Sequence, residues 1–474
     1  MDDIYYWSAT DQRRAIAARR IGVHELVSAH IDRILAVDPQ VNAVVTRTFD
    51  TALEQATRCD RLLARGAAQG ALFGLPVAHK DTFYTKGIRT THGSPIFADV
   101  VPTVDSAVVA RQIAAGAITL GKTNVPEFAA GSHTFNPIFG PSFNPYAADR
   151  SVGGSSGGAA AALAAGMVAL ADGSDMGGSL RNPASFCNVV GLRPTPGRVP
   201  NVPSAQPFNT VSVSGPMGRT VQDVGLLMSV LAGEHPDDPL SYGNDAAGFA
   251  HLRARACKGV RVAVSPTLGG LPIDDAVQRA LQEGVRTLQD LGCIVEEAEP
   301  DLGDADEVFE TLRALSFATG YGPLRATDGE RMKETIRWNI DMGLALTGEA
   351  VTRAERHRTR LVNQARAFFD THEFLVAPVS QLPPFDVGLD YPRQVAGVEM
   401  ENYIAWMRSC SRVTVLGLPA ISLPCSFTED GVPIGIQIIA RPRQEHALLC
   451  FALAFENARP TGRRRPAFDQ SRHG

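Results

Sequence analysis

Two short segments rich in glycine and serine lie close together in the chain and flank an alanine-rich stretch. The first is Gly153-Gly154-Ser155-Ser156-Gly157-Gly158, and the second runs from Gly173 to Arg181. Glycine loses more conformational freedom on folding than any other residue, so such clusters mark places where backbone takes positive φ or closely approaches a ligand. Between them, residues 157–168 are predicted to form an alanine-rich helix that can pack tightly. The pattern therefore predicts two loops that bracket one alanine-rich helix.

The second loop, predicted over Asp172 to Arg181, has the composition of an anion site. Successive backbone N–H groups of Gly177, Gly178 and Ser179 can converge on one point. A helix starting near Asn182 would add its positive N-terminal end. A serine hydroxyl beside such donors suits acyl transfer, because the oxyanion forms where the donors point. A flexible turn is the simpler interpretation of either loop alone, but the pair, together with a lysine at a strand end, favours a site.

The rest of the sequence alternates between helical and strand patterns. The N-terminal ~70 residues have apolar residues at helical spacing, and Leu75 to Ala78 is a short apolar strand that runs into Lys80. Residues 131–158 are loop-like, and residues 300–372 are mostly helical and charged. Further strands are expected at 117–120, 259–264, 293–297, 374–379, 421–424 and 434–439, and further helices at 105–115, 274–291 and 445–456.

This alternation predicts the α/β class: one large domain with a central mixed β-sheet covered by helices on both faces. No internal repeat or linker divides the chain, so residues 1–474 are expected to form a single domain. Within it we expect an N-terminal helical segment (1–70), a catalytic core (71–300), a mostly helical peripheral layer (301–372) and a C-terminal part of the sheet with closing helices (373–474).

Composition narrows the possible partners. The 45 Lys and Arg residues against 50 Asp and Glu give a formal charge of −5, which argues against nucleic-acid binding. The start lacks the apolar core of a secretory signal, and no apolar stretch is long enough for a bilayer. The seven cysteines are scattered without a CxxC pair, as expected for reduced thiols. We therefore expect a cytoplasmic protein, a monomer or homodimer, without a cofactor, and with no metal because no ligand cluster has metal spacing.

Two short motifs are matched in form only. Residues 116–123 satisfy the phosphate-loop expression G-x-x-x-x-G-K-[ST], but the four residues between the glycines read as an apolar strand and cannot cradle a phosphate. Residues 153–157 satisfy G-x-S-x-G, the nucleophile elbow of α/β-hydrolases. That elbow needs a buried strand directly upstream, whereas residues 144–151 are polar and turn-like. Neither interpretation is favoured.

Several blocks together resemble the amidase signature family. They comprise residues 75–81, 120–124, 126–128, 140–145, 153–158, 173–181, 191–195, 417–420 and 435–437. The resemblance covers nearly the whole chain, and its central block spans more than a hundred residues. It implies the amidase signature fold and a Ser–cisSer–Lys triad in which Ser179 attacks the carbonyl, Ser155 relays protons and Lys80 is the base. It also implies a cis peptide bond between Gly154 and Ser155.

The resemblance assigns further roles. Backbone amides of Met176, Gly177, Gly178 and Ser179 would form the oxyanion hole, and Asp175 and Arg181 would brace the loop. Substrate would contact the segment Ala129, Ala130, Gly131 and Ser132, together with Asn182. The chain departs from the family pattern at Met176, where Thr is usual, at Asn188, where Gly is usual, and at Arg193, where Lys is usual. Met176 acts through its backbone, so its side chain bears on substrate choice rather than on the chemistry.

A lysine base requires a lowered pKa. At the ordinary value of ~10.4, only about one lysine in ~2500 is neutral at pH 7. Burial removes much of this handicap, and Lys80 ends an apolar run. Strand alternation directs Asp81 and His79 to the opposite face, so Asp81 need not pair with Lys80 and His79 is expected to be a hydrogen-bonded core residue. A surface lysine at a strand end is the alternative.

The predicted function is hydrolysis of a carboxamide or related C–N acyl bond, including a carbamate, through an acyl-enzyme on Ser179. The substrate is expected to be a small amide or carbamate of partly apolar or aryl character. An alternative within the family is the glutaminase subunit of a glutamyl-/aspartyl-tRNA amidotransferase, and an alternative outside it is an inactive scaffold. Cys187 could act as a nucleophile but is expected to be a small core residue.

Overall fold

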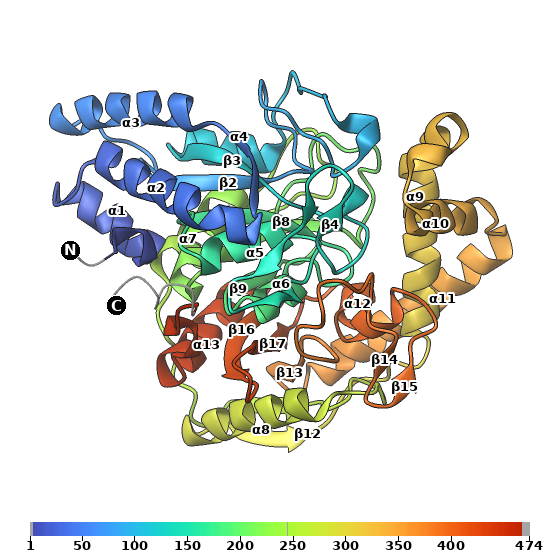
Figure 1. Cartoon of the computed structure of the whole chain (residues 1–474). Helices are drawn as coiled ribbons and strands as arrows, with labels where there is room; N and C mark the ends of the chain where they lie inside the picture. Colours follow the sequence, from blue (N-terminus) through green and yellow to red (C-terminus); the bar gives the residue numbers. More distant parts are fainter. Residues whose placement is uncertain (1–2, 244, 467–474) are drawn as a thin grey trace.

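A mixed sheet runs through the centre of the molecule (Figure 1). The computed structural model describes residues 3–243 and 245–466, and within these ranges the sheet has 11 strands. In spatial order they are β1 (Val44–Arg47), β3 (Ile118–Thr123), β2 (Pro76–Lys80), β8 (Leu170–Asp175), β10 (Val213–Gly218), β9 (Val190–Arg193), β16 (Ala420–Phe427), β17 (Pro433–Ala440), β13 (Phe374–Pro378), β11 (Arg261–Val264) and β12 (Ile294–Glu297).

Short hairpins lie outside the central sheet. They are β4 (Phe135–Asn136) with β5 (Gly140–Pro141), β6 (Phe143–Asn144) with β7 (Ala147–Ser151), and β14 (Gln394–Val395) with β15 (Val398–Glu399). Two of them fall within residues 131–158, the segment predicted as loop, so part of that loop is paired.

Helices cover both faces of the sheet. They are α1 (Ala9–Ala17), α2 (Val23–Val41), α3 (Phe49–Ala64), α4 (Ala107–Ala114), α5 (Gly157–Ala164), α6 (Arg181–Phe186), α7 (Val221–Leu231), α8 (Asp275–Asp290), α9 (Ala305–Asp328), α10 (Glu334–Leu344), α11 (Gly348–Phe368), α12 (Arg408–Val415) and α13 (Glu445–Ala458). Helices α5 and α6 contact each other and the sheet, whereas α7, α13 and α8 form a second contacting series. Helices α9, α10 and α11 lie together at one side of the molecule (Figure 1).

Three neighbouring parallel strands carry candidate site residues at their carboxyl ends. Strands β3, β2 and β8 are parallel, with Val77 of β2 level with Leu170 of β8. Since parallel strands end at the same edge of a sheet, Lys80 at the end of β2 lies near the end of β8, and its Nζ is 2.9 Å from Ser174 Oγ. The open edge formed by these carboxyl ends is the usual position of ligand sites in α/β proteins.

Helix α5 is buried along its whole length because its residues are small. All eight residues, from Gly157 to Ala164, are buried. A Cβ atom at Gly158 would lie 2.3 Å from the backbone nitrogen of Asn124, so only glycine allows this close approach. The alanine-rich composition thus lets the helix seat directly on the sheet.

Most sequence-based expectations for the fold are confirmed. The N-terminal helices, the strand ending at Lys80, the helix after Gly157 and the helical segment of residues 300–372 all form. The predicted loop of residues 172–181 is wrong in its first part, because residues 172–175 belong to β8. That strand reads Leu-Ala-Asp-Gly-Ser-Asp and carries no β-branched residue, so nothing in its local composition indicates a strand. In the described ranges, no helix is both long and apolar enough to span a membrane.

Candidate active site

Lys80 ends β2 with a fully buried side chain. Its Nζ lies 2.7 Å from Ser155 Oγ, 3.0 Å from Ser156 Oγ and 2.9 Å from Ser174 Oγ. The exposed fraction of the residue is 0%. Lys80 is therefore not the surface lysine of the alternative interpretation: its amine sits among serine hydroxyls contributed by both glycine–serine segments.

Burial governs the charge of this amine. It lowers the pKa of Lys80 to about 7, against the opposing charges of Asp175 and Asp172, which favour the ammonium. At that pKa about half of the molecules hold a neutral amine at pH 7, compared with about one in ~2500 for an ordinary lysine. A large part of the Lys80 amines is therefore uncharged at neutral pH and able to accept a proton.

The neighbours of Lys80 in sequence point elsewhere, as strand alternation predicts. His79 Nδ1 lies 2.6 Å from Asp172 Oδ2, and its Nε2 lies 3.0 Å from Thr119 Oγ1. The carboxylate of Asp81 accepts hydrogen bonds from the backbone and hydroxyl of Thr91. His79 is accordingly a hydrogen-bonded core histidine, and Asp81 forms no ion pair with Lys80.

The first glycine–serine segment presents Ser155 at the start of α5. The peptide bond between Gly154 and Ser155 is cis, as the family resemblance implied. The Thr134 hydroxyl donates to the Gly153 carbonyl at 2.8 Å and anchors the segment from outside. The backbone N–H of Ser156 donates to the Ser179 carbonyl at 3.2 Å, so the two segments are in direct contact.

Ser155 and Ser179 both face a cavity of 490 Å³, which Ser174, Met176 and Gly177 also line. Ser155 is 1% exposed and Ser179 is 8% exposed. The more accessible of the two hydroxyls is therefore that of Ser179, at the cavity wall, whereas Ser155 lies between the cavity and the buried amine.

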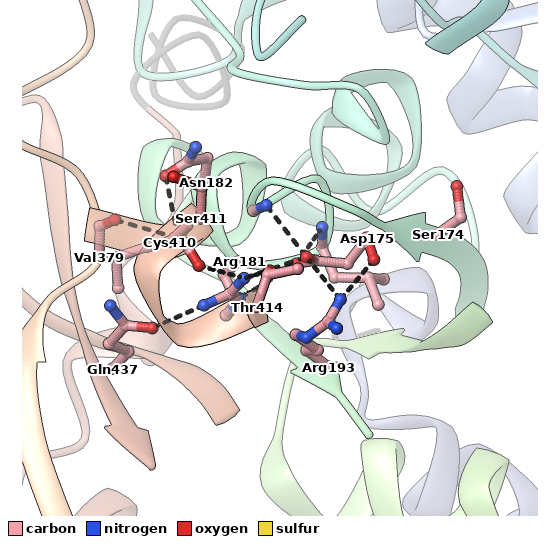
Figure 2. A network of polar contacts seen from close by, with 12 residues as sticks. Ser174, Asp175, Arg181, Asn182, Arg193, Val379, Cys410, Ser411, Thr414 and Gln437 are labelled. Atoms are coloured by element: carbon pink, nitrogen blue, oxygen red, sulfur yellow. Dashed lines mark hydrogen bonds and ion pairs between the residues drawn. The ribbon is translucent and has the colours of Figure 1, made fainter. Parts of the chain in front are cut away.

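Asp175 and Arg181 bind each other within the second segment and enclose residues 176–180 (Figure 2). Arg181 donates from Nε to Asp175 Oδ2 and from Nη2 to Oδ1, each at 3.0 Å, in a bidentate pair. Burial alone would raise the pKa of Asp175, but the charges of Arg181 and Arg193 outweigh it and hold that pKa well below its ordinary value. The residues between Asp175 and Arg181 form a loop closed by a buried ion pair.

Arg181 also joins this loop to the C-terminal quarter of the chain. Its Nη1 donates to Gln437 Oε1 of β17 at 2.9 Å, and its Nη2 donates to the Cys410 carbonyl and the Thr414 hydroxyl of α12 (Figure 2). No local sequence signal connects these positions, which are more than 200 residues apart. The loop is thereby fixed by partners that only the tertiary fold brings near.

The backbone amides of this loop divide into two sets. Gly178 N–H donates to Asp175 Oδ1 at 3.0 Å, and Leu180 N–H donates to Oδ2 at 3.2 Å. The amides of Met176, Gly177 and Ser179 have no protein acceptor among the described residues. The expectation that Gly178 supplies an oxyanion donor is therefore corrected, because the buried Asp175 carboxylate takes its N–H.

The predicted substrate-contacting residues are only partly brought to the cavity. Ala129 and Gly131 line it. Ala130 and Ser132 instead line a small neighbouring cavity of 30 Å³, and Asn182 donates a hydrogen bond to Ser132 at 3.1 Å behind the wall. Residues 129 and 131 thus face the main cavity, whereas residues 130 and 132 face the smaller one, so only alternate residues of the predicted segment reach the larger space.

Sequence reasoning missed most of the cavity wall. Aromatic and apolar side chains line much of it: Phe83, Tyr84, Phe97, Phe128, Phe317, Tyr321, Leu324 and Met407. Arg313, on α9, also lines it. These residues come from segments far apart in the chain, and α9 was expected to belong to a peripheral layer.

The motifs set aside from sequence do not form sites. Strand β3 occupies residues 118–123 and follows α4, so the phosphate-loop expression lies on a strand as predicted. The strand β7 does precede the G-x-S-x-G match, contrary to expectation, but it is a half-exposed strand outside the central sheet. Cys187 is fully buried, and its burial raises the pKa of the thiol, so it is a core residue.

A group of possible metal ligands, Asp304, Glu307 and His357, lies at the surface of α9 and α11. Arg353 Nε donates to Glu307 at 2.7 Å, and Arg360 donates to Asp304. Both carboxylates are thus paired with guanidinium groups, which makes this cluster an ion-pair network.

The departures from the family pattern have structural consequences. Asn188 has a φ of 55°, the left-handed conformation for which glycine is usual, and asparagine is among the residues that tolerate it. Arg193 donates to both the carbonyl and the carboxylate of Asp175. Met176 lies at the cavity wall, with its sulfur 3.4 Å from Arg313 Nη1.

The chain matches the family model described as Amidase over residues 25–449. It is 34% identical to an acylamidase of Rhodococcus erythropolis, covering 98% of each chain. It is also 34% identical to a glutamyl-tRNA(Gln) amidotransferase subunit of Moorella thermoacetica, over 98% of this chain and 99% of that protein. Among solved structures, a bacterial aryl acylamidase of the amidase signature family superposes with a TM-score of 0.88 at 29% identity, covering 96% of each chain.

The family match spans most of the chain, the sheet and its helices agree with solved amidase signature enzymes, and the relatives include an acylamidase. The chain therefore belongs to the amidase family, as an amidase signature enzyme, and is an amidase hydrolase.

Proposed function

We propose that this amidase cleaves an apolar or aryl carboxamide, or a related carbamate, through an acyl-enzyme on Ser179. The observation that carries the proposal is the buried amine of Lys80, 2.7 Å from Ser155 Oγ, behind a cavity that exposes Ser179. A neutral amine, a relaying hydroxyl and an accessible hydroxyl in that order suit nucleophilic acyl transfer.

In the first half-reaction the Lys80 amine accepts the proton of Ser155 while Ser155 accepts that of Ser179. The Ser179 oxygen forms a bond to the carbonyl carbon, and the carbonyl electron pair moves onto its oxygen. We expect the amides of Met176, Gly177 and Ser179, which have no protein acceptor among the described residues, to donate to that oxyanion. The C–N bond then breaks, and the leaving nitrogen takes a proton back through the same hydroxyls.

In the second half-reaction a water molecule replaces the amine. It gives its proton to the same relay, attacks the ester carbonyl, and releases the acid with Ser179 restored. The aromatic and apolar wall of the cavity supports an apolar or aryl substrate, since such surface is buried favourably against it. The resemblance to an acylamidase and an aryl acylamidase points the same way.

A panel of 4-nitroacetanilide, a short aliphatic amide, an aryl carbamate and glutamine tests the proposal. We expect release of 4-nitroaniline by the wild type, and a loss of at least about a thousandfold in kcat for Ser179→Ala. Cys187→Ala is the matched control for the alternative nucleophile and should retain activity. An acylated peptide containing Ser179, detected by mass spectrometry, would identify the intermediate. Turnover that survives Ser179→Ala would refute the assignment.

A glutaminase role within an amidotransferase is the second candidate, favoured by the 34% identity to the glutamyl-tRNA(Gln) amidotransferase protein of Moorella thermoacetica. Ammonia release from glutamine, measured with and without added amidotransferase partner proteins, separates the two candidates. Glutaminase activity that exceeds hydrolysis of every aryl amide would favour the second.

A further inference from the structure

Arg313 is a buried guanidinium at the wall of the active-site cavity. It lies on α9 and is 3% exposed. Its Nε donates to Asn339 Oδ1 at 3.1 Å, its Nη2 donates to Tyr403 Oη at 2.7 Å, and its Nη1 faces Met176 Sδ at 3.4 Å. These contacts use three of the five N–H groups of the side chain, and the thioether is a weak acceptor.

No carboxylate in the described part of the chain pairs with Arg313. Arginines from neighbouring α12 are paired: Arg412 bonds Asp306 of α9, and Arg408 bonds Glu310 of α9. A buried charge is costly unless a counter-charge or several strong hydrogen bonds compensate it. Arg313 is held in place by neutral groups and by the ring of Phe317, 4.6 Å from its Cζ, which fixes the guanidinium without neutralising it.

The other described residues of the cavity wall carry no charge at pH 7. Among the described residues that line it, none is aspartate, glutamate or lysine, and Arg313 is the one arginine. The other titratable cation is His92, and burial lowers its pKa to about 4, so it is neutral at pH 7. The cavity is therefore an aromatic and polar space with one uncompensated positive charge.

We propose that the substrate of this amidase carries a carboxylate, and that Arg313 binds it. The inference rests on the proposed function and specifies its substrate class: an amide with an anionic group on an apolar or aromatic frame. A guanidinium with N–H groups to spare matches a carboxylate in shape and charge. The carboxylate of the substrate would then provide the negative charge that no described side chain of the protein provides to Arg313.

The same wall disfavours an amino-acid amide such as glutamine. Its α-carboxylate would fit Arg313, but its α-ammonium would find no acidic side chain among the described residues lining the cavity. A buried, unpaired ammonium costs far more free energy than a neutral group in the same place. The class proposed here is consequently an amide acid without a free amino group.

Matched substrate pairs test the proposal. On the acyl side, glutaryl-4-nitroanilide is compared with 5-methylhexanoyl-4-nitroanilide, in which an isopropyl group replaces the carboxylate. On the amine side, 4-acetamidobenzoate is compared with 4-isopropylacetanilide. For the pair whose acid reaches Arg313, we expect kcat/KM to favour the anion by about tenfold to a hundredfold, the range for hydrogen bonds to a charged group.

The variants measure how that ratio depends on the guanidinium. Arg313→Met should reduce the ratio to about one or below, mainly through KM, and Arg313→Lys should keep part of it, since the charge remains without the planar fork. Arg412→Met is the control, because it removes a guanidinium that has an acidic partner and does not line the cavity. It should leave the ratio unchanged. Circular dichroism melts establish that each variant is folded.

Failure of this inference is distinguishable from failure of the proposed function. If amides are hydrolysed but neither ratio changes in Arg313→Met and Arg313→Lys, the carboxylate proposal is overturned and the amidase proposal stands. If no amide is turned over, binding of glutarate by isothermal titration calorimetry still decides the matter. Binding by the wild type that Arg313→Met abolishes supports the inference, and equal or absent binding in both overturns it.

Discussion

Replacing Lys80 by methionine tests whether the buried amine is the base of the proposed reaction. The side chain is fully buried, and methionine keeps its length while removing the amine. Since Ser155 would then have no base to receive its proton, we expect hydrolysis at neutral pH to fall by at least about a thousandfold. The wild-type pH profile supplies the second half of the test.

The expected shape of that profile follows from the lowered pKa of Lys80, about 7. The active form is the neutral amine, so kcat/KM rises with pH and levels off above the pKa. It should be about a hundredfold below the plateau at pH 5 and about tenfold below it at pH 6. An ordinary lysine, with a pKa of ~10.4, would instead give a rise that continues through pH 9.

Lys122 is the matched control for this assignment. It is also fully buried, on the adjacent strand β3, and burial lowers its pKa to about 8 against the charge of Asp81. Its Nζ bonds the Phe83 carbonyl and the Thr85 hydroxyl, not the serines of the site. Lys122→Met should therefore leave the midpoint near 7. A wild-type midpoint near 8 that vanishes in Lys122→Met, with Lys80→Met still active, would refute the reasoning.

Three further outcomes follow from the loop and its supports. Arg181→Met leaves the buried Asp175 carboxylate without its bidentate partner, so the free energy of unfolding in urea should fall by about 3–5 kcal/mol; a loss below about 1 kcal/mol would contradict the bracing role. Folding lowers the pKa of the Asp175 carboxyl, so the ionised carboxylate stabilises the folded protein at pH values above the unfolded-state pKa of ~3.9. This stabilisation is lost as pH falls below that value. The free energy of unfolding of the wild type should therefore drop more steeply than that of Asp175→Asn between pH 5 and pH 3. Gly178 has a φ of +107°, and a Cβ atom there would lie 2.6 Å from Cys410 Cβ. Gly178→Ala should therefore displace the loop and lower kcat by about a hundredfold. Circular dichroism should show that the secondary structure is retained. An unchanged kcat would show that the loop tolerates the shift.

The sequence predicts the parts of the site that depend on local pattern. An apolar run identifies β2 and hence the buried position of Lys80, and alternation along a strand places His79 and Asp81 correctly. The glycine and alanine clusters locate the two loops and α5. The roles predicted for Ser155 and Ser179 depend on the resemblance to the amidase signature family, which is carried by the sequence blocks given above.

Other parts depend on contacts that no local pattern encodes. Strand β8 was missed because its aspartates look like loop residues, although Asp172 and Asp175 are satisfied by buried partners from other elements. Arg313 lies on a charged helix, where arginine normally indicates a solvent-exposed face. Its burial depends on Asn339 of α10 and on Tyr403, and only packing reveals that the guanidinium faces the cavity.

The hydrogen bonds of Arg181 to Gln437, Cys410 and Thr414 form only after the C-terminal quarter of the chain has been synthesised. Ribosomes make the N-terminal part of a chain first, so Lys80, Ser155 and Ser179 emerge long before those partners. Until the last quarter has been translated, the loop from Asp175 to Arg181 lacks its anchor on α12 and β17. A half-made polypeptide therefore carries Lys80, Ser155 and Ser179 before the residues that anchor this loop have been translated.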